Sequence, residues 1–263
     1  MARAVLMEWT KLRTVRSTGW LVLAAVVCTA GAGALVSWSA DVRNCPADEP
    51  GCVQDVVRLS LAGVYLGQVA VVVLGVLAMS GEYGAGLVRT TLATCPRRRH
   101  VFAAKAAVVS ALVLGAGLLG VLGSLLAARA LLPGHGFVPS AGYPPLSPAD
   151  EPTLRAYLGT VLYLWLVALL GLGVAAAVRH TPGALTAVLA LLFTPATVVT
   201  LMNDPRWREW SEKLAPMTAG LKVQVTVGLD AQPIGPWAGL AVLAGYAGVA
   251  LALGVTAFAV RDA

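Results

Sequence analysis

Residues 81–105 read GEYGAGLVRTTLATCPRRRHVFAAK, and this basic stretch separates two uncharged runs of membrane length. The chain has 263 residues, of which 58% are hydrophobic and 12% are charged, whereas soluble domains carry about 25% charged residues. This shortage of charge indicates a membrane protein. The net charge of +6 then reflects basic residues that fix orientation in the bilayer. Nucleic-acid binding is not expected, because stacking aromatic residues do not accompany the basic ones.

Charged residues divide the rest of the chain into six uncharged windows. A transmembrane helix needs about 20 apolar residues, and every window reaches that length. The windows are continuously apolar rather than alternating, which favours helices over a closed barrel. We therefore predict an all-α membrane protein with a single transmembrane domain over 1–263. Its expected spans cover about 19–39, 59–80, 102–128, 156–178, 182–202 and 235–260.

The residues before the first span predict a helix that lies on the membrane surface over 2–18. Val5, Trp9 and Leu12 share one helical face there, and a flexible basic tail is the alternative. The first span also has an alternative, because residues 37–40 resemble a signal-peptide cleavage site. Its apolar core is longer than the 7–15 residues usual for a signal peptide, which favours an uncleaved span.

Charge asymmetry predicts the orientation of the chain. Six spans put both termini, residues 81–105 and Arg179 on one side, with 11 of the 19 basic and three of the 13 acidic residues. The positive-inside rule makes this side cytoplasmic. The basic residues expected to anchor it at the headgroups are Arg13, Arg16, Arg97, Arg98 and Arg99.

Two features are expected on the opposite side. Cys45 and Cys52 lie in the first outer loop, where they could form a disulfide or remain two unpaired thiols. Asp204 followed by Pro205 predicts the start of a short outer helix before the last span, with Asp204 as the N-cap. Pro216 is expected to end this helix.

Glycines in the second span, at Gly63 and Gly67, form a small-xxx-small pattern that lets helices approach closely. The expected spans hold no acidic or basic side chain well inside them, which disfavours a carrier driven by an ion gradient. Their scattered polar side chains could line a pathway or bond to neighbouring helices. The candidate pathway residues are Tyr65, Gln68, Thr194 and Thr197.

Catalytic and metal-binding motifs are missing from the sequence. It contains no phosphate loop, no His-Glu-x-x-His, no Cys-x-x-Cys and no Gly-x-Ser-x-Gly turn. We therefore expect no catalytic residue, no bound metal and no enzymatic activity in this chain.

Residues 82–99 admit two interpretations from their chemistry alone. A short helix can form before Pro96, which stops it because the residue before a proline avoids helical geometry. The segment is then either a surface that contacts a partner or a cytoplasmic loop that anchors the third span through its arginines.

Several motifs together resemble those of one family. Glu82-Tyr83, Gly86, Arg89 to Leu92, Pro96 to Arg98 and Lys105 form one group, and Glu8-Trp9-Thr10-Lys11-Leu12 to Trp20 form another. These groups and the six spans are similar to permeases of bacterial ATP-binding-cassette (ABC) transporters of the type-2 exporter family. The resemblance extends over the whole chain.

This resemblance implies an export permease in the bacterial inner membrane, with both termini cytoplasmic. It implies a second permease copy in a homodimer and two copies of an ABC ATPase, which bind the ATP and Mg that this chain does not. Residues 82–99 would be the coupling helix. Its coupling residues would be Glu82, Tyr83, Gly86, Arg89 and Leu92. The substrate cannot be identified from the sequence, but an uncharged pathway suits an apolar or amphipathic cargo such as a drug, a lipid or an antibiotic product. The alternative function is a membrane scaffold or assembly factor without transport.

Overall fold

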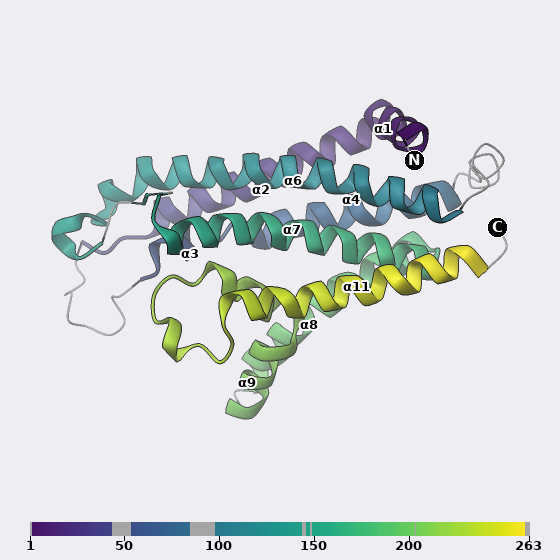
Figure 1. Cartoon of the computed structure of the whole chain (residues 1–263). Helices are drawn as coiled ribbons and strands as arrows, with labels where there is room; N and C mark the ends of the chain where they lie inside the picture. The colour runs from purple at the N-terminus through teal and green to yellow at the C-terminus, as the bar shows by residue number, and fades with distance from the viewer. Residues whose placement is uncertain are drawn as a thin grey trace.

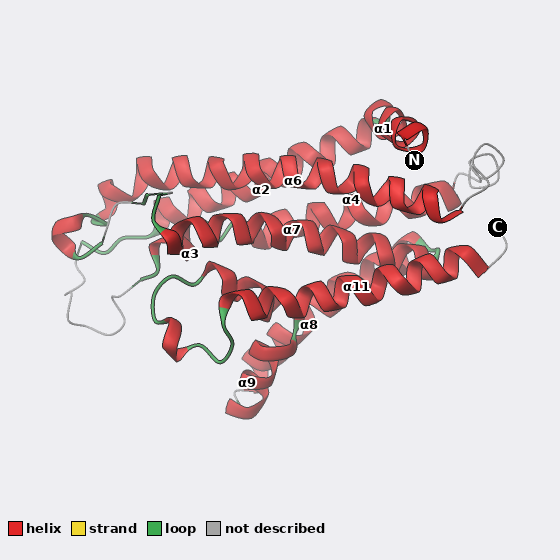
Figure 2. Cartoon of the chain, viewed as in Figure 1, coloured by secondary structure: helices red, strands yellow, loops and turns green. Residues whose placement is uncertain are grey.

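The computed structural model describes residues 2–43, 54–84, 98–143, 146–147, 149–202 and 204–260. Over these ranges the regular structure is helical, and Figure 2 shows helices joined by loops and turns, without strands in the described part. The longer helices are α1 (Ala2–Thr14), α2 (Arg16–Ser39), α4 (Val64–Gly84), α6 (Arg98–Leu131), α7 (Glu151–Val178), α8 (Thr181–Met202), α9 (Pro205–Leu214) and α11 (Pro236–Val260). The short ones are α3 (Val56–Ser60), α10 (Pro216–Gly220), and the 3-10 turns η1 (Leu132–His135), η2 (Pro139–Ala141), η3 (Leu221–Gln224) and η4 (Leu229–Ala231).

Six of the helices within the described ranges are long and apolar enough to cross a membrane, namely α2, α4, α6, α7, α8 and α11. This confirms the prediction of an all-α protein with six candidate spans. The expected second span differs in its start, because 59–80 is divided between α3 and α4. Asp55 caps α3 by accepting a hydrogen bond from the Arg58 backbone N–H, and that helix ends before α4 begins. The fourth span starts earlier than expected because Glu151 and Pro152 form the first turn of α7, where proline is tolerated.

Helices α4 and α7 form the centre of the bundle, and α2 and α8 lie at its margin. Two-thirds of the spanning window is buried in α4 and in α7, against 17% in α2 and in α8. Figure 1 shows α2, α4, α6, α7 and α11 running side by side along the length of the bundle. The high burial of α7 fits its largely apolar sequence after Arg155.

Close helix contacts depend on small residues, as the glycine pattern predicts. A methyl group on Gly63 would overlap the carbonyl group of Thr29 on α2, and one on Gly67 would overlap the Thr29 hydroxyl. Similarly, Gly75 of α4 lies against the Ala168 carbonyl of α7. In lipid, such close packing replaces the hydrophobic effect as the force that holds helices together.

Both termini lie at one end of the bundle, together with the end of α4 and the start of α6 (Figure 1). The N-terminal helix is shorter than predicted. It ends at Thr14, Val15 is extended, and Arg16 already belongs to α2. That α1 lies in the membrane surface remains a prediction.

The short helix predicted before the last span is present as α9. The Asp204 carboxylate accepts a hydrogen bond of 2.8 Å from the Arg206 backbone N–H, and Pro205 occupies the first turn, as predicted. Pro216 does not leave a loop behind it but starts α10, which continues into η3. The residues of these two elements are largely buried against α7, α8 and α11.

Candidate functional site

The candidate site lies at the end of the bundle where α1 crosses the start of α6. Its main feature is an ion pair between Glu8 of α1 and Lys105 of α6, whose Nζ and Oε2 atoms are 2.8 Å apart. Both residues are only 1% exposed. Buried charges are tolerated in proteins when they are paired, and this pair holds α1 against α6.

Glu8 lies on the face of α1 that packs on the protein. Trp9 and Leu6 of the same helix are exposed instead. This arrangement is the reverse of a helix on a soluble core, and it leaves apolar side chains facing outward. The other carboxylate oxygen of Glu8, Oε1, is buried without a hydrogen-bond partner in the described part of the chain. The contact therefore depends strongly on the Lys105 charge.

The predicted coupling residues precede Lys105 in the sequence, and the structure describes only some of them. Glu82 and Tyr83 belong to the last turn of α4, and their side chains are outside the described set. Gly86, Arg89 and Leu92 are outside the described residues altogether. Their role in coupling stays a prediction.

Four of the five predicted anchoring arginines belong to described helices, and these four fall near the same end of the bundle. Arg16 and Arg99 are exposed at the starts of α2 and α6. Arg13 and Arg98 are helical, but their side chains are not described, and Arg97 is outside the described residues.

The candidate pathway residues are not brought together. Gln68 is fully buried; its carbonyl oxygen accepts a 2.6 Å hydrogen bond from the Tyr163 hydroxyl, and its amide nitrogen contacts the Met217 sulfur at 3.4 Å. Tyr65, one turn earlier on α4, is exposed and lines a shallow pocket with Gln224. The Gln68 contacts are those of a residue that joins α4 to α7 and α10.

Thr194 and Thr197 lie on α8, away from this buried network, and both are exposed. The Thr197 hydroxyl donates to the Phe193 carbonyl of its own helix at 3.0 Å. A role for these threonines or for Tyr65 and Gln68 in a pathway stays a prediction.

Asp55 makes a second contact that the sequence did not reveal, at the end of the bundle opposite the termini. Its carboxylate caps α3 and also accepts hydrogen bonds from the Thr226 hydroxyl at 2.7 Å and the Val227 backbone N–H at 3.2 Å. Nearby, Arg155 donates to the Val225 carbonyl at 2.8 Å. These bonds hold the loop after η3 against α3 and α7.

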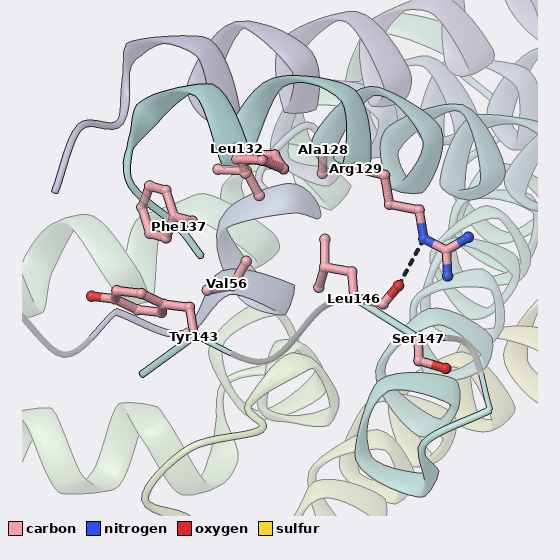
Figure 3. Close-up of a pocket in the computed structure, with 9 residues that line it drawn as sticks. Val56, Ala128, Arg129, Leu132, Phe137, Tyr143, Leu146 and Ser147 are labelled. Atoms are coloured by element: carbon pink, nitrogen blue, oxygen red, sulfur yellow. Dashed lines mark hydrogen bonds between the residues drawn. The ribbon is translucent and has the colours of Figure 1, made fainter. Parts of the chain in front are cut away.

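A pocket of about 330 Å³ lies at the same end, between the last turns of α6 and the loop that leads to α7. Figure 3 shows Phe137 and Tyr143 on one side of it and Arg129 and Ser147 on the other. The Phe137 and Tyr143 rings meet edge to face at a centroid distance of 4.9 Å. The remaining labelled lining residues are Val56, Ala128, Leu132 and Leu146.

Cys45 and Cys52 lie outside the described residues, so the disulfide expectation is not addressed. Cys28 of α2 is a free thiol. The described residues contain no cluster of three or more His, Cys, Asp or Glu side chains that could hold a metal.

No protein-family model and no curated protein matches the chain. Six candidate spans define its class as a multi-pass, all-helical membrane protein.

Proposed function

We propose that this chain is the permease subunit of an ATP-driven exporter and that a separate ATPase docks on residues 82–99. The observation that carries the proposal is the Glu8–Lys105 pair. These residues belong to the two motif groups that resemble the type-2 exporter family, and 97 positions separate them in the chain. Their contact joins the two motif groups at one end of the bundle.

The position of the pair suggests how force could travel. Helix α6 starts at Arg98, within the last two residues of the proposed docking segment, and continues without interruption to Leu131. A displacement of this segment would therefore move α6 as a rigid helix. Helix α1 would move with it, because the buried ion pair joins the two helices. Exposed ion pairs contribute only about 0–1 kcal/mol, whereas breaking a buried one costs about 3–5 kcal/mol. Because the pair is buried, it can hold α1 to α6 during such a displacement.

The other parts of the proposal follow from the family resemblance. A second copy of the permease would complete a homodimer, and two ATPase subunits would bind ATP and Mg. The orientation with cytoplasmic termini in a bacterial inner membrane rests on the excess of basic residues at that side. An interior with few charges suits an apolar or amphipathic cargo, such as an antibiotic or another drug.

Co-purification tests this proposal against the scaffold alternative. The tagged chain is extracted from its native membrane in mild detergent, and the associated chains are sequenced and assayed for ATP hydrolysis. We expect a phosphate-loop ATPase in a one-to-one ratio with the permease. Arg89→Glu should release it, whereas Arg206→Glu on α9 should not, because α9 lies away from the end of the bundle that holds the termini. A membrane-inserted chain that carries no ATPase would refute the proposal and favour the scaffold.

A further inference from the structure

An apolar groove runs along the surface of the bundle between α6 and α7. Its volume is about 100 Å³, and its walls are formed by side chains of Leu118, Val121, Leu122 and Leu125 from α6 and Leu154, Tyr157, Leu158 and Val161 from α7. The Tyr157 hydroxyl is paired with the Ser60 hydroxyl at 3.0 Å. The groove therefore offers hydrocarbon contacts and no free polar group from its lining residues.

Arg129 lies one helical turn beyond Leu125, on the same face of α6 that forms the groove. Its Nε donates a 2.7 Å hydrogen bond to the Leu146 carbonyl, which fixes the guanidinium in the neighbouring pocket, beyond the Leu125 end of the groove. In Figure 3 the terminal nitrogens point away from Leu132 and Phe137. Arg129 forms no ion pair within the described part of the chain, and the guanidinium keeps donors for an anion.

The distance from Leu118 to Arg129 along α6 matches one leaflet of a bilayer. Eleven residues separate Leu118 from Arg129, which corresponds to about 16 Å at 1.5 Å per residue. Half of a hydrocarbon core of about 30 Å is about 15 Å. Leu118 also lies near the middle of the uncharged window 106–128. The α6 lining of the groove thus begins near the middle of the membrane and ends at Leu125, and Arg129 is placed one turn further, at the headgroup level.

We propose that this groove is a binding site for an anionic phospholipid. One acyl chain lies along the leucines of α6 and α7, and the phosphate accepts hydrogen bonds from Arg129. Guanidinium and phosphate form strong, charge-assisted hydrogen bonds, which a neutral groove could not provide. A zwitterionic headgroup carries its own cation beside the phosphate. The Arg129 charge therefore stabilises it less than it stabilises an anionic headgroup. This site does not depend on the proposed transport function.

Native mass spectrometry of the purified chain tests the site. Dioleoyl-phosphatidylglycerol and dioleoyl-phosphatidylcholine, which share their acyl chains, are titrated separately, and oleate is added as a competitor. We expect one tightly held phosphatidylglycerol, bound about tenfold more tightly than phosphatidylcholine, as expected for one hydrogen-bonded charge at the surface. Arg129→Gln should remove this preference, while Arg58→Gln, an exposed arginine at the same end of the bundle, should preserve it.

A second pair of variants tests the acyl-chain groove. Leu122 and Leu126 are one turn apart on α6 and are 51% and 64% exposed, but only Leu122 lines the groove. Leu122→Trp should fill the groove and abolish tight binding, whereas Leu126→Trp should leave it unchanged. Equal affinity for the two lipids, equal effects of the two arginine variants, or equal effects of the two tryptophan variants would each overturn the proposal. Displacement by equimolar oleate would overturn it as well, because the occupant would then be a free fatty acid.

Discussion

Replacing Glu8 with alanine should release α1 from the bundle while the six candidate spans stay folded. The variant leaves the Lys105 ammonium buried without this carboxylate, which was 2.8 Å away. At an effective dielectric constant of about 20, that attraction amounts to about 6 kcal/mol, most of which offsets the desolvation of the two charges. Removal of one partner of a buried ion pair typically costs about 3–5 kcal/mol. This cost exceeds what the few contacts of a short helix can balance, so α1 should detach.

Hydrogen exchange of the α1 amides measures this release directly. A cost of about 3 kcal/mol corresponds to a fall in protection of more than about 100-fold. The double variant Glu8→Leu/Lys105→Met removes both charges and should recover much of the protection, because apolar replacements of a buried pair are often neutral.

Glu209→Ala is the matched control on α9. Its pair with Lys213 is shorter, at 2.6 Å, but the side chains are 61% and 44% exposed. Exposed pairs contribute about 0–1 kcal/mol, so α9 should lose less than about fivefold protection. Unchanged exchange of α1 in Glu8→Ala, or a double variant as damaged as the single one, would refute the reasoning from burial.

Three further predictions concern packing, loops and pH. Gly63→Val should destabilise the protein by at least about 2 kcal/mol in thermal unfolding, because the new side chain meets the α2 backbone; Gly31→Val, which enters open space, should not. Asp55→Ala should raise the rate of proteolysis at residues 225–227 at least tenfold, because the loop loses its hydrogen-bond acceptor. Asp150→Ala is the control, since the Asp150 side chain makes no cap hydrogen bond. Partial burial raises the pKa of Glu212, but hydrogen bonds and charges of Lys222 and then Arg208 outweigh it and lower that pKa below 4.5. This contact should therefore stabilise α9 above about pH 4.5 and be lost as the pH falls through the lower value, and Lys222→Met should move the loss of α9 exchange protection to higher pH.

The spans and their closest contacts could be predicted because their signals are local. An uncharged run of about 20 residues is sufficient to indicate a membrane helix. Gly63 and Gly67 are four positions apart, so they lie on one face of a helix whatever their partner is. Likewise, Asp204 followed by Pro205 determines the start of α9 without help from the rest of the chain.

The Glu8–Lys105 pair could not be predicted in this way, because it joins residues 97 positions apart. Two local signals point to it only in retrospect. Glu8 lies three positions after Val5 and four before Leu12, so this charge shares a helical face with apolar residues. Lys105 is flanked by Ala103-Ala104 and Ala106-Ala107, a setting that is unusual for a solvated charge. The contact of Asp55 with Thr226 is even harder to predict from the sequence, because the two residues are 171 positions apart and the loop that carries Thr226 has no periodic pattern.

The pathway candidates show the limit of reading polar residues in a span. A polar side chain in lipid must find a partner, and sequence alone does not say whether that partner is another helix or a cargo. Gln68 has Tyr163 and Met217 as partners, which are 95 and 149 positions away. Its burial follows from the central place of α4, and this place follows from tertiary packing.

ATP hydrolysis by the purified complex in lipid nanodiscs tests the central claim most directly, namely that residues 82–99 couple this chain to an ATPase. The wild-type chain should change the hydrolysis rate of its partner severalfold relative to the isolated ATPase. The double variant Glu82→Ala/Arg89→Glu should return the rate to that of the isolated ATPase while the chain stays in the membrane. A double variant that retains the wild-type rate would show that residues 82–99 do not couple the two proteins.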